Sequence, residues 1–91
     1  MSYIAAIHDI SDPARFWAAV AAGGDLPQGI VLHSTYVRDD GSRATCLWEA
    51  PSVETVRELL DATVGDSSSN EYFEVAPQHP GTLGLPAQST A

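Results

Sequence analysis

Histidines in apolar surroundings are the first residues of this chain that could carry chemistry. His8 lies near the end of a mostly apolar run, YIAAIHDI, in which an imidazole could act as a general acid or base, a metal ligand or a hydrogen-bond donor. The competing interpretation is a core histidine bonded to backbone or carboxylate, because a buried imidazole needs a polar partner. His33 lies in a run of β-forming residues, where a half-exposed imidazole is usually a surface residue. His8 is therefore the first candidate for catalysis, ligand binding and metal binding, and His33 is a second candidate for ligand binding.

Further candidates lie in a pair of neighbouring runs rich in β-forming residues. Tyr36 and Trp48 are predicted to lie on facing strands, where they would either stack as a cross-strand pair or form the wall of a pocket for a planar ligand. Glu49 could act as a general base if it is desolvated, although carboxylates near strand ends more often cap a backbone group or pair with arginine. Cys46 has no base beside it in the sequence and is expected to be a small buried apolar residue. Tyr36, Trp48 and Glu49 complete the predicted ligand-binding set.

No motif for nucleotide, zinc or nucleophile-elbow chemistry is present in the sequence, which lacks GxGxxG, GxxxxGKS/T, HExxH, CxxC and GxSxG. The three histidines share no HxH or HxxxH spacing that would preassemble two metal ligands. A metal or catalytic site would therefore have to be assembled by the fold from residues far apart in the sequence.

Length and charge narrow the range of partners. A chain of 91 residues with 44% hydrophobic and 18% charged residues is typical of one folded domain, and a domain of this size is often completed by oligomerisation. The four basic residues are all arginine and lie singly, and the formal net charge is -8, so neither nucleic acid nor an anionic membrane is an expected partner. A single cysteine, a start without a signal-peptide pattern and the lack of a long apolar run predict a cytoplasmic protein.

The elements that must position the candidate residues alternate in type along the chain. The predicted order is a strand at 3–10, a helix from Pro13 to the stop at Gly23, strands at 30–37 and 44–50 joined by an Asp-Gly turn, a helix opened by Ser52 and ended by Gly65, a loop at 66–70 and a strand at 71–76. A β-α-β-β-α-β order with two right-handed crossovers predicts an α+β, ferredoxin-like fold. In that fold both helices cover one face of a four-stranded antiparallel sheet.

The other face of this sheet would be left uncovered by the helices. The first strand is apolar on both sides, since Ile4 and Ala6 alternate with Ala5 and Ile7. A second copy of the chain, sheet against sheet, is the simplest cover, so a homodimer is expected. Residues 1–76 form the predicted domain, and 77–91 form a Pro- and Gly-rich C-terminal arm.

The second half of the chain resembles a family of short bacterial proteins of unknown function, one branch of which binds nickel. The matching residues are Gly29, Ile30, Tyr36, Gly41, Cys46, Leu47, Glu49, Ala50, Pro51 and Val56, the strand 72–75 and, in the first half, His8. The resemblance implies a ferredoxin-like dimer with His8 as a nickel ligand. Ala6 and Leu60 stand where the family has an acidic residue and a histidine, so the implied metal site is incomplete here.

By fold, the chain also resembles the dimeric α/β-barrel superfamily, which includes cofactor-independent monooxygenases, isomerases and polyketide cyclases. This resemblance implies an apolar or aromatic substrate enclosed between helices and sheet, with no cofactor, and His8, Tyr36 and Trp48 are residue types that such a pocket uses. The first functional hypothesis is a homodimer that binds a small ligand, with a transition metal at His8 as one version. The second is a cofactor-independent enzyme with His8 as general acid or base, and the third is a structural or interaction protein.

Overall fold

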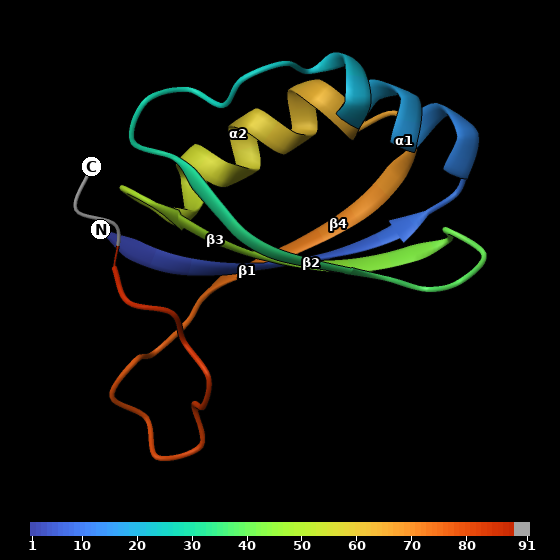
Figure 1. Ribbon diagram of the computed structural model, residues 1–91. Coiled ribbons are helices and arrows are strands. Elements are labelled where there is room, and N and C mark those ends of the chain that lie inside the picture. Colours follow the sequence, from blue (N-terminus) through green and yellow to red (C-terminus); the bar gives the residue numbers. More distant parts are fainter. Residues whose placement is uncertain (89–91) are drawn as a thin grey trace.

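Both helices lie on one face of a four-stranded antiparallel sheet in the computed structural model, which describes residues 1–88 (Figure 1). The elements are β1 (Ser2–Ile10), α1 (Pro13–Ala22), β2 (Val31–Val37), β3 (Arg43–Ala50), α2 (Val53–Val64) and β4 (Ser68–Glu74). The strands are ordered β2-β3-β1-β4 across the sheet. This order confirms the predicted α+β, ferredoxin-like fold.

Capping side chains set the starts of both helices, as the sequence predicts. The Asp12 carboxylate accepts a hydrogen bond from the backbone N–H of Arg15 at 3.1 Å, and Pro13 occupies the first helical position of α1. The Ser52 hydroxyl accepts from the backbone N–H of Thr55 at 3.3 Å. Each helix then turns an apolar stripe toward the sheet, and its buried members are Phe16 in α1 and Val56, Leu60 and Val64 in α2.

The hairpin between β2 and β3 is closed by a turn that requires glycine. Gly41 has a φ of +77°, a left-handed conformation that residues with a Cβ rarely adopt. The indole Nε1–H of Trp17 donates to the Gly41 carbonyl at 3.0 Å. This bond fixes α1 over the tip of the hairpin and leaves the Trp17 indole with its hydrogen-bond partner.

A β-bulge in β2 rules out the stacking of Tyr36 on Trp48, one of the two arrangements expected for these rings. Leu32 pairs with Trp48, but Ser34 pairs with Leu47, so His33 is an extra residue in β2. Beyond the bulge Tyr36 pairs with Thr45 and shares the outer face with it, whereas Trp48 points toward the helices. Tyr36 is 71% exposed and Trp48 is 4% exposed. The two rings therefore lie on opposite faces of the sheet and cannot stack.

The last strand also differs from the prediction, because β4 begins at Ser68 and ends at Glu74, not at 71 and 76. The polar residues 66–70 were predicted as a loop on composition. β1 runs on to Ile10, however, and its backbone pairs with Ser68 through Glu74. Polar side chains are tolerated there because β4 is an edge strand. The shift brings Asn70 directly opposite His8.

The core fills the space between the sheet and the helices. The predicted alternation in β1 is confirmed, since Ile4, Ala6 and His8 are buried, and Ile4 and Ala6 belong to the core beneath the helices. On the outer face Tyr36 and Phe73 are exposed, at 71% and 47%. Neither helix among residues 1–88 has the length and apolar character needed to cross a membrane.

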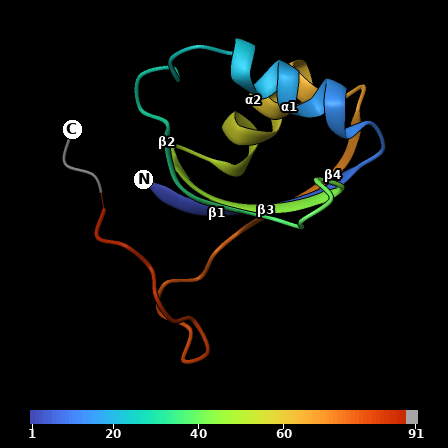
Figure 2. The same cartoon turned by 45° about the vertical axis from the view of Figure 1, so that its right-hand side comes forward.

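The arm that follows β4 runs below the outer face of the sheet, on the side away from the helices (Figures 1 and 2). The Tyr3 hydroxyl donates to the Pro86 carbonyl, and the Gln88 side chain donates to the Met1 carbonyl at 2.8 Å. These bonds hold the arm against the start of β1. Leu83 in the arm is 89% exposed, so the arm covers one end of the outer face and leaves Tyr36 and Phe73 open.

Candidate ligand-binding site

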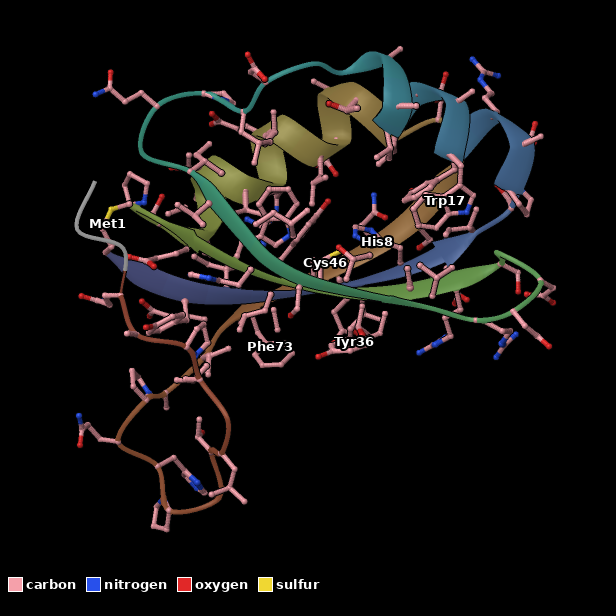
Figure 3. All side chains as sticks on the ribbon, viewed as in Figure 1. Met1, His8, Trp17, Tyr36, Cys46 and Phe73 are labelled. Carbon is pink, nitrogen blue, oxygen red and sulfur yellow. The ribbon has the colours of Figure 1, made fainter. Side chains whose placement is uncertain are left out.

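The site of interest is a cavity of about 250 Å³ between the helices and the sheet, which we call the inner cavity. Its wall is mostly aromatic and aliphatic, and His8, Thr35 and Cys46 bring polar atoms to it from three different strands. Figure 3 shows His8 and Cys46 on the same side of the sheet as Trp17 and the helices, with Tyr36 and Phe73 on the opposite side. The sheet therefore positions the polar groups, and the helices supply the apolar cover.

His8 is held in one orientation at the floor of this cavity. Its side chain is buried, its Nδ1 lies 2.7 Å from Oδ1 of Asn70, and its ring packs 5.4 Å from that of Phe16. The Ser68 hydroxyl lies 2.8 Å from Asn70 Oδ1 and 3.0 Å from the Val64 carbonyl, so these two acceptors compete for its one proton. Because an amide oxygen only accepts, the bond from His8 to Oδ1 places the proton on Nδ1 and leaves a lone pair on Nε2. Burial lowers the pKa of His8, and the Asn70 bond offsets part of that shift.

Cys46 stands beside the free nitrogen of His8. The sulfur lies 3.7 Å from Nε2 of His8 and 3.6 Å from Oγ1 of Thr35. Burial raises the pKa of the Cys46 thiol, and the contact with Thr35 counteracts part of this rise. With the thiol pKa raised and the imidazole pKa lowered, the resting pair is a neutral S–H beside a neutral imidazole.

Trp48 lines the same cavity and carries a buried donor that is unsatisfied among the described residues. Its side chain is 4% exposed, and its Nε1–H has no hydrogen-bond partner among residues 1–88. A buried donor without a partner costs about 1–3 kcal/mol, so one that lines a cavity is a natural binding point for an acceptor. Trp17 lines the cavity too, but its indole N–H is already bonded to Gly41.

Exposed aliphatic side chains surround the open side of the inner cavity. Val20 at the end of α1, Leu26 in the following loop and Leu32 in β2 all line the cavity and are 45%, 42% and 39% exposed. An apolar rim of this kind favours the entry of apolar molecules over ions.

The stability of the protein is predicted to depend on the protonation of His8. Because burial lowers its folded-state pKa, the unfolded chain takes up this proton first, at the ordinary pKa of about 6.5. The contribution of neutral His8 to the free energy of unfolding is fully present above that pH. It falls as the pH drops toward the lowered pKa, by up to about 1.4 kcal/mol per pH unit. Urea unfolding of the parent and of His8→Gln across this range measures the effect. The parent is expected to lose more stability than the variant, and a constant difference would show that His8 binds its proton equally in both states.

The remaining predicted site residues lie outside the inner cavity. Glu49 is fully buried on the outer face, where it accepts a hydrogen bond from Nε2 of His33 at 2.9 Å, and the Tyr3 ring lies 6.0 Å from the His33 ring. Burial and the nearby Glu49 raise the pKa of Tyr3. The structure thus brings His8 and Trp48 together, pairs His33 with Glu49 elsewhere, and leaves Tyr36 on the outer surface.

The donors near His8 do not fit a nickel site. Nδ1 of His8 is bonded to Asn70, and Nε2 faces a thiol whose pKa is raised. Within residues 1–88, no three His, Cys, Asp or Glu side chains gather closely enough to hold a metal ion. Tight binding of a transition metal needs three or four such ligands.

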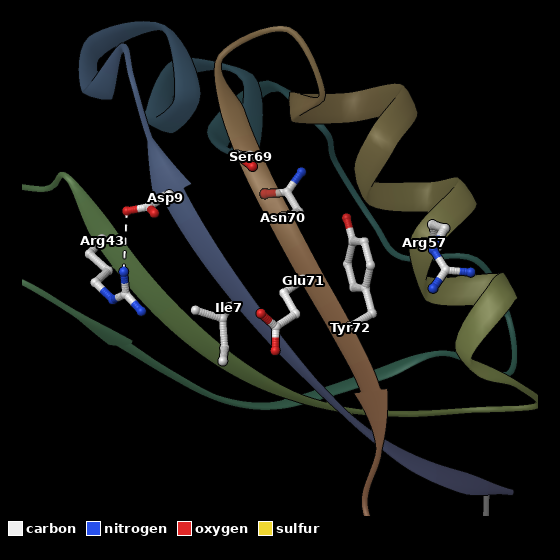
Figure 4. Close-up of a pocket in the computed structure, with 8 residues that line it drawn as sticks. All are labelled: Ile7, Asp9, Arg43, Arg57, Ser69, Asn70, Glu71 and Tyr72. Carbon is white, nitrogen blue, oxygen red and sulfur yellow. Dashed lines mark hydrogen bonds and ion pairs between the residues drawn. The ribbon is translucent and has the colours of Figure 1, made fainter.

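A second hollow, of about 480 Å³, lies along the edge of β4 (Figure 4). It is larger than the inner cavity, but its charged groups are solvated and in part already paired. Arg43 lies 3.2 Å from Asp9, and these side chains are 46% and 71% exposed. The Tyr72 hydroxyl donates to Asp61 at 3.0 Å, and Arg57 lies over the Tyr72 ring. This hollow lacks the buried unsatisfied donor that distinguishes the inner cavity.

Sequence reasoning missed Asn70 and the contact between Cys46 and His8. Asn70 was assigned to a loop, so nothing connected it to the first strand. The contact between Cys46 and His8 depends on the β1–β3 register, in which Ala6 is the residue opposite Cys46. The length of β1 could have indicated both features. A long central strand needs a long partner on each side, so residues of both neighbouring strands must lie beside His8.

Comparison of the chain with protein-family models, with curated proteins and with solved structures gives no match. The ferredoxin-like topology is therefore the level at which the chain is classified.

Proposed function

We propose that the protein binds a small, largely apolar organic molecule that offers a carbonyl oxygen or similar hydrogen-bond acceptor to the inner cavity. The observation that carries this proposal is Trp48, a residue of the cavity wall whose buried Nε1–H has no partner among the described residues. A ligand oxygen bonded to this group would remove the cost of leaving it unsatisfied.

The dimensions of the inner cavity indicate the size of the molecule. A dry cavity of about 150 Å³ in a protein core accepts benzene. The inner cavity, at about 250 Å³, has room for a monocyclic aromatic compound with a short polar substituent. Ionic ligands are disfavoured because the wall and the rim are mainly apolar, and the formal net charge of -8 disfavours anions further.

Binding is best tested with two molecules of the same shape. Acetophenone has a carbonyl where α-methylstyrene has a methylene group, so the pair differs in the acceptor alone. In a ¹H–¹⁵N titration we expect acetophenone to shift the Trp48 indole N–H strongly downfield and to bind more tightly. The indole resonance of Trp17 is the internal control, because its N–H stays bonded to Gly41. Failure of both compounds to perturb cavity resonances would refute the proposed function.

We also propose that the protein is a homodimer that pairs through the outer face of the sheet, as in dimeric α/β barrels. Tyr36 and Phe73 supply large exposed rings to this face, and Ala5, Ile7 and Leu47 lie partly exposed on the strands between them. Burying these side chains contributes about 25 cal/mol per Å² of apolar surface removed from water.

A charge placed on the outer face is expected to separate the subunits. Tyr36→Glu should give a monomer in light scattering coupled to size exclusion, because the interface loses a large ring and a carboxylate would have to be desolvated between the two sheets. Ala18→Glu adds the same charge on the exposed surface of α1 and should leave the dimer intact. A parent protein that is already monomeric at micromolar concentration would contradict the dimer.

A further inference from the structure

We propose that Cys46, His8 and Asn70 form a nucleophile, its base and the residue that orients the base, and that they transfer the acyl group of a small apolar ester bound in the inner cavity. This inference rests on the proposed binding function and adds a reaction to it. It also replaces the sequence-based interpretation of Cys46 as an inert apolar residue.

The order of contacts is the one that acyl transfer requires. The Cys46 sulfur lies 3.7 Å from Nε2 of His8, and Nδ1 of His8 lies 2.7 Å from Oδ1 of Asn70. The Ser68 hydroxyl contacts the same Asn70 oxygen at 2.8 Å and also the Val64 carbonyl at 3.0 Å. A nucleophile near the free nitrogen of an imidazole, with the other nitrogen held by a third group, is the arrangement of thiol and serine acyl-transfer sites. The sulfur distance is longer than a tight hydrogen bond, as is common before a substrate is bound.

A second, independent feature of the cavity supplies the electrophilic side of the reaction. Trp48 lies two residues from Cys46 on the same face of β3, which places the two about 6.6 Å apart along the strand. Its buried Nε1–H has no partner among residues 1–88. An ester with its carbonyl carbon at the sulfur can direct its oxygen toward this donor, which would then stabilise the negative charge that develops there.

The resting state of the pair determines how the thiol is activated. Because burial raises the pKa of Cys46 and lowers that of His8, no preformed thiolate stands beside an imidazolium. The imidazole therefore acts as a general base during the attack, as it does for a serine nucleophile.

The reaction balances without any outside reagent except water. As Sγ forms its bond to the carbonyl carbon, the thiol proton passes to Nε2 of His8, and the carbonyl oxygen takes the negative charge. The carbon–oxygen bond to the leaving alcohol then breaks, and His8 returns the proton to that oxygen. Water attacks the resulting thioester and gives a proton to Nε2 of His8, the carbon–sulfur bond breaks, and His8 passes that proton to the departing sulfur, which releases a carboxylic acid and restores the free thiol.

The inference is tested with p-nitrophenyl acetate as probe. The parent protein is expected to release one p-nitrophenolate per chain in a burst and to carry an acetyl group on Cys46, identified by peptide mass spectrometry. The chain has no lysine to react in its place. Cys46→Ala should show no burst, and His8→Gln should slow acylation by about 100-fold. His79→Gln is the matched histidine control, because His79 lies in the arm, and it should leave the burst unchanged.

Asn70 acts through His8 and needs a readout of its own. Asn70→Ala should slow acylation, since Nδ1 loses its acceptor and the ring can take the unproductive tautomer. Asn70→Asp should restore the acylation rate that Asn70→Ala loses, provided that the pH is high. It should also move the acid limb of the pH–rate profile to higher pH than in the parent, because a carboxylate stabilises the imidazolium. A residue with a structural role alone would leave that limb in place.

The outcomes separate the two proposals. Binding of acetophenone without acetylation of Cys46 in the parent would overturn the acyl-transfer inference and leave the binding function standing. Equal acylation rates in the parent and His8→Gln would also overturn it, because Cys46 would then be reacting as an ordinary thiol. A parent protein that neither binds acetophenone nor is acylated would refute the binding function and the acyl-transfer inference together. Protection of Cys46 by acetophenone in the parent, a test that needs no variant to fold, would support both.

Discussion

His33→Ala is expected to lower the free energy of unfolding by about 3 kcal/mol, far more than a partly exposed histidine normally contributes. Glu49 is fully buried, and one of its carboxylate oxygens accepts the hydrogen bond from Nε2 of His33 at 2.9 Å. Removing His33 takes this hydrogen-bond donor away from a fully buried carboxyl group. The cost falls on Glu49 rather than on contacts of His33 itself.

A double-mutant cycle isolates this effect. Glu49→Leu combined with His33→Ala removes both polar partners, so the double variant is expected to be more stable than His33→Ala alone. The free energies come from urea unfolding followed by circular dichroism, for which a domain of this size is suited. Additive losses in the cycle would show that the two side chains act independently and would contradict the explanation.

Trp48→Phe is expected to weaken binding of acetophenone by about 10-fold, the equivalent of one hydrogen bond of about 1.4 kcal/mol. Phenylalanine keeps an aromatic wall but has no N–H. The affinity for α-methylstyrene, which cannot accept a hydrogen bond, should change much less. The measured quantity is therefore the ratio of the two affinities, obtained by calorimetry on the parent and the variant.

Trp17→Phe is the matched control for this experiment. Trp17 also lines the cavity, but its Nε1–H is bonded to the Gly41 carbonyl, so its loss should leave the affinity ratio unchanged. A ratio that is the same in the parent and in Trp48→Phe would mean that the ligand oxygen binds elsewhere. The proposal would then lose the observation that carries it.

Most of the fold follows from local signals in the sequence. Asp12, Pro13 and Ser52 fix the helix starts because capping depends on a few neighbouring residues. The inward orientation of His8 follows from the two-residue period of β1, which has no irregularity. These features are predictable since each depends on residues adjacent in the chain.

The parts that sequence reasoning could not supply depend on pairing between distant strands. The bulge at His33 carries no glycine or other local mark, yet it moves Tyr36 to the face opposite Trp48. Asn70 and Cys46 reach His8 from β4 and β3, across separations of 62 and 38 residues. The alternation of apolar residues identifies the face of a residue but not its neighbours, so the set around His8 emerged only with the strand register.

The bulge has one more consequence, for changes in chain length. Leu32 and Ser34 already occupy the regular positions opposite Trp48 and Leu47, so His33 is surplus to the ladder. Deleting His33 would leave the pairing of β2 with β3 unchanged. The main loss would be the imidazole that bonds to Glu49. A chain without the extra residue would keep the sheet register and present one hydrogen-bond donor fewer to the carboxyl group at position 49.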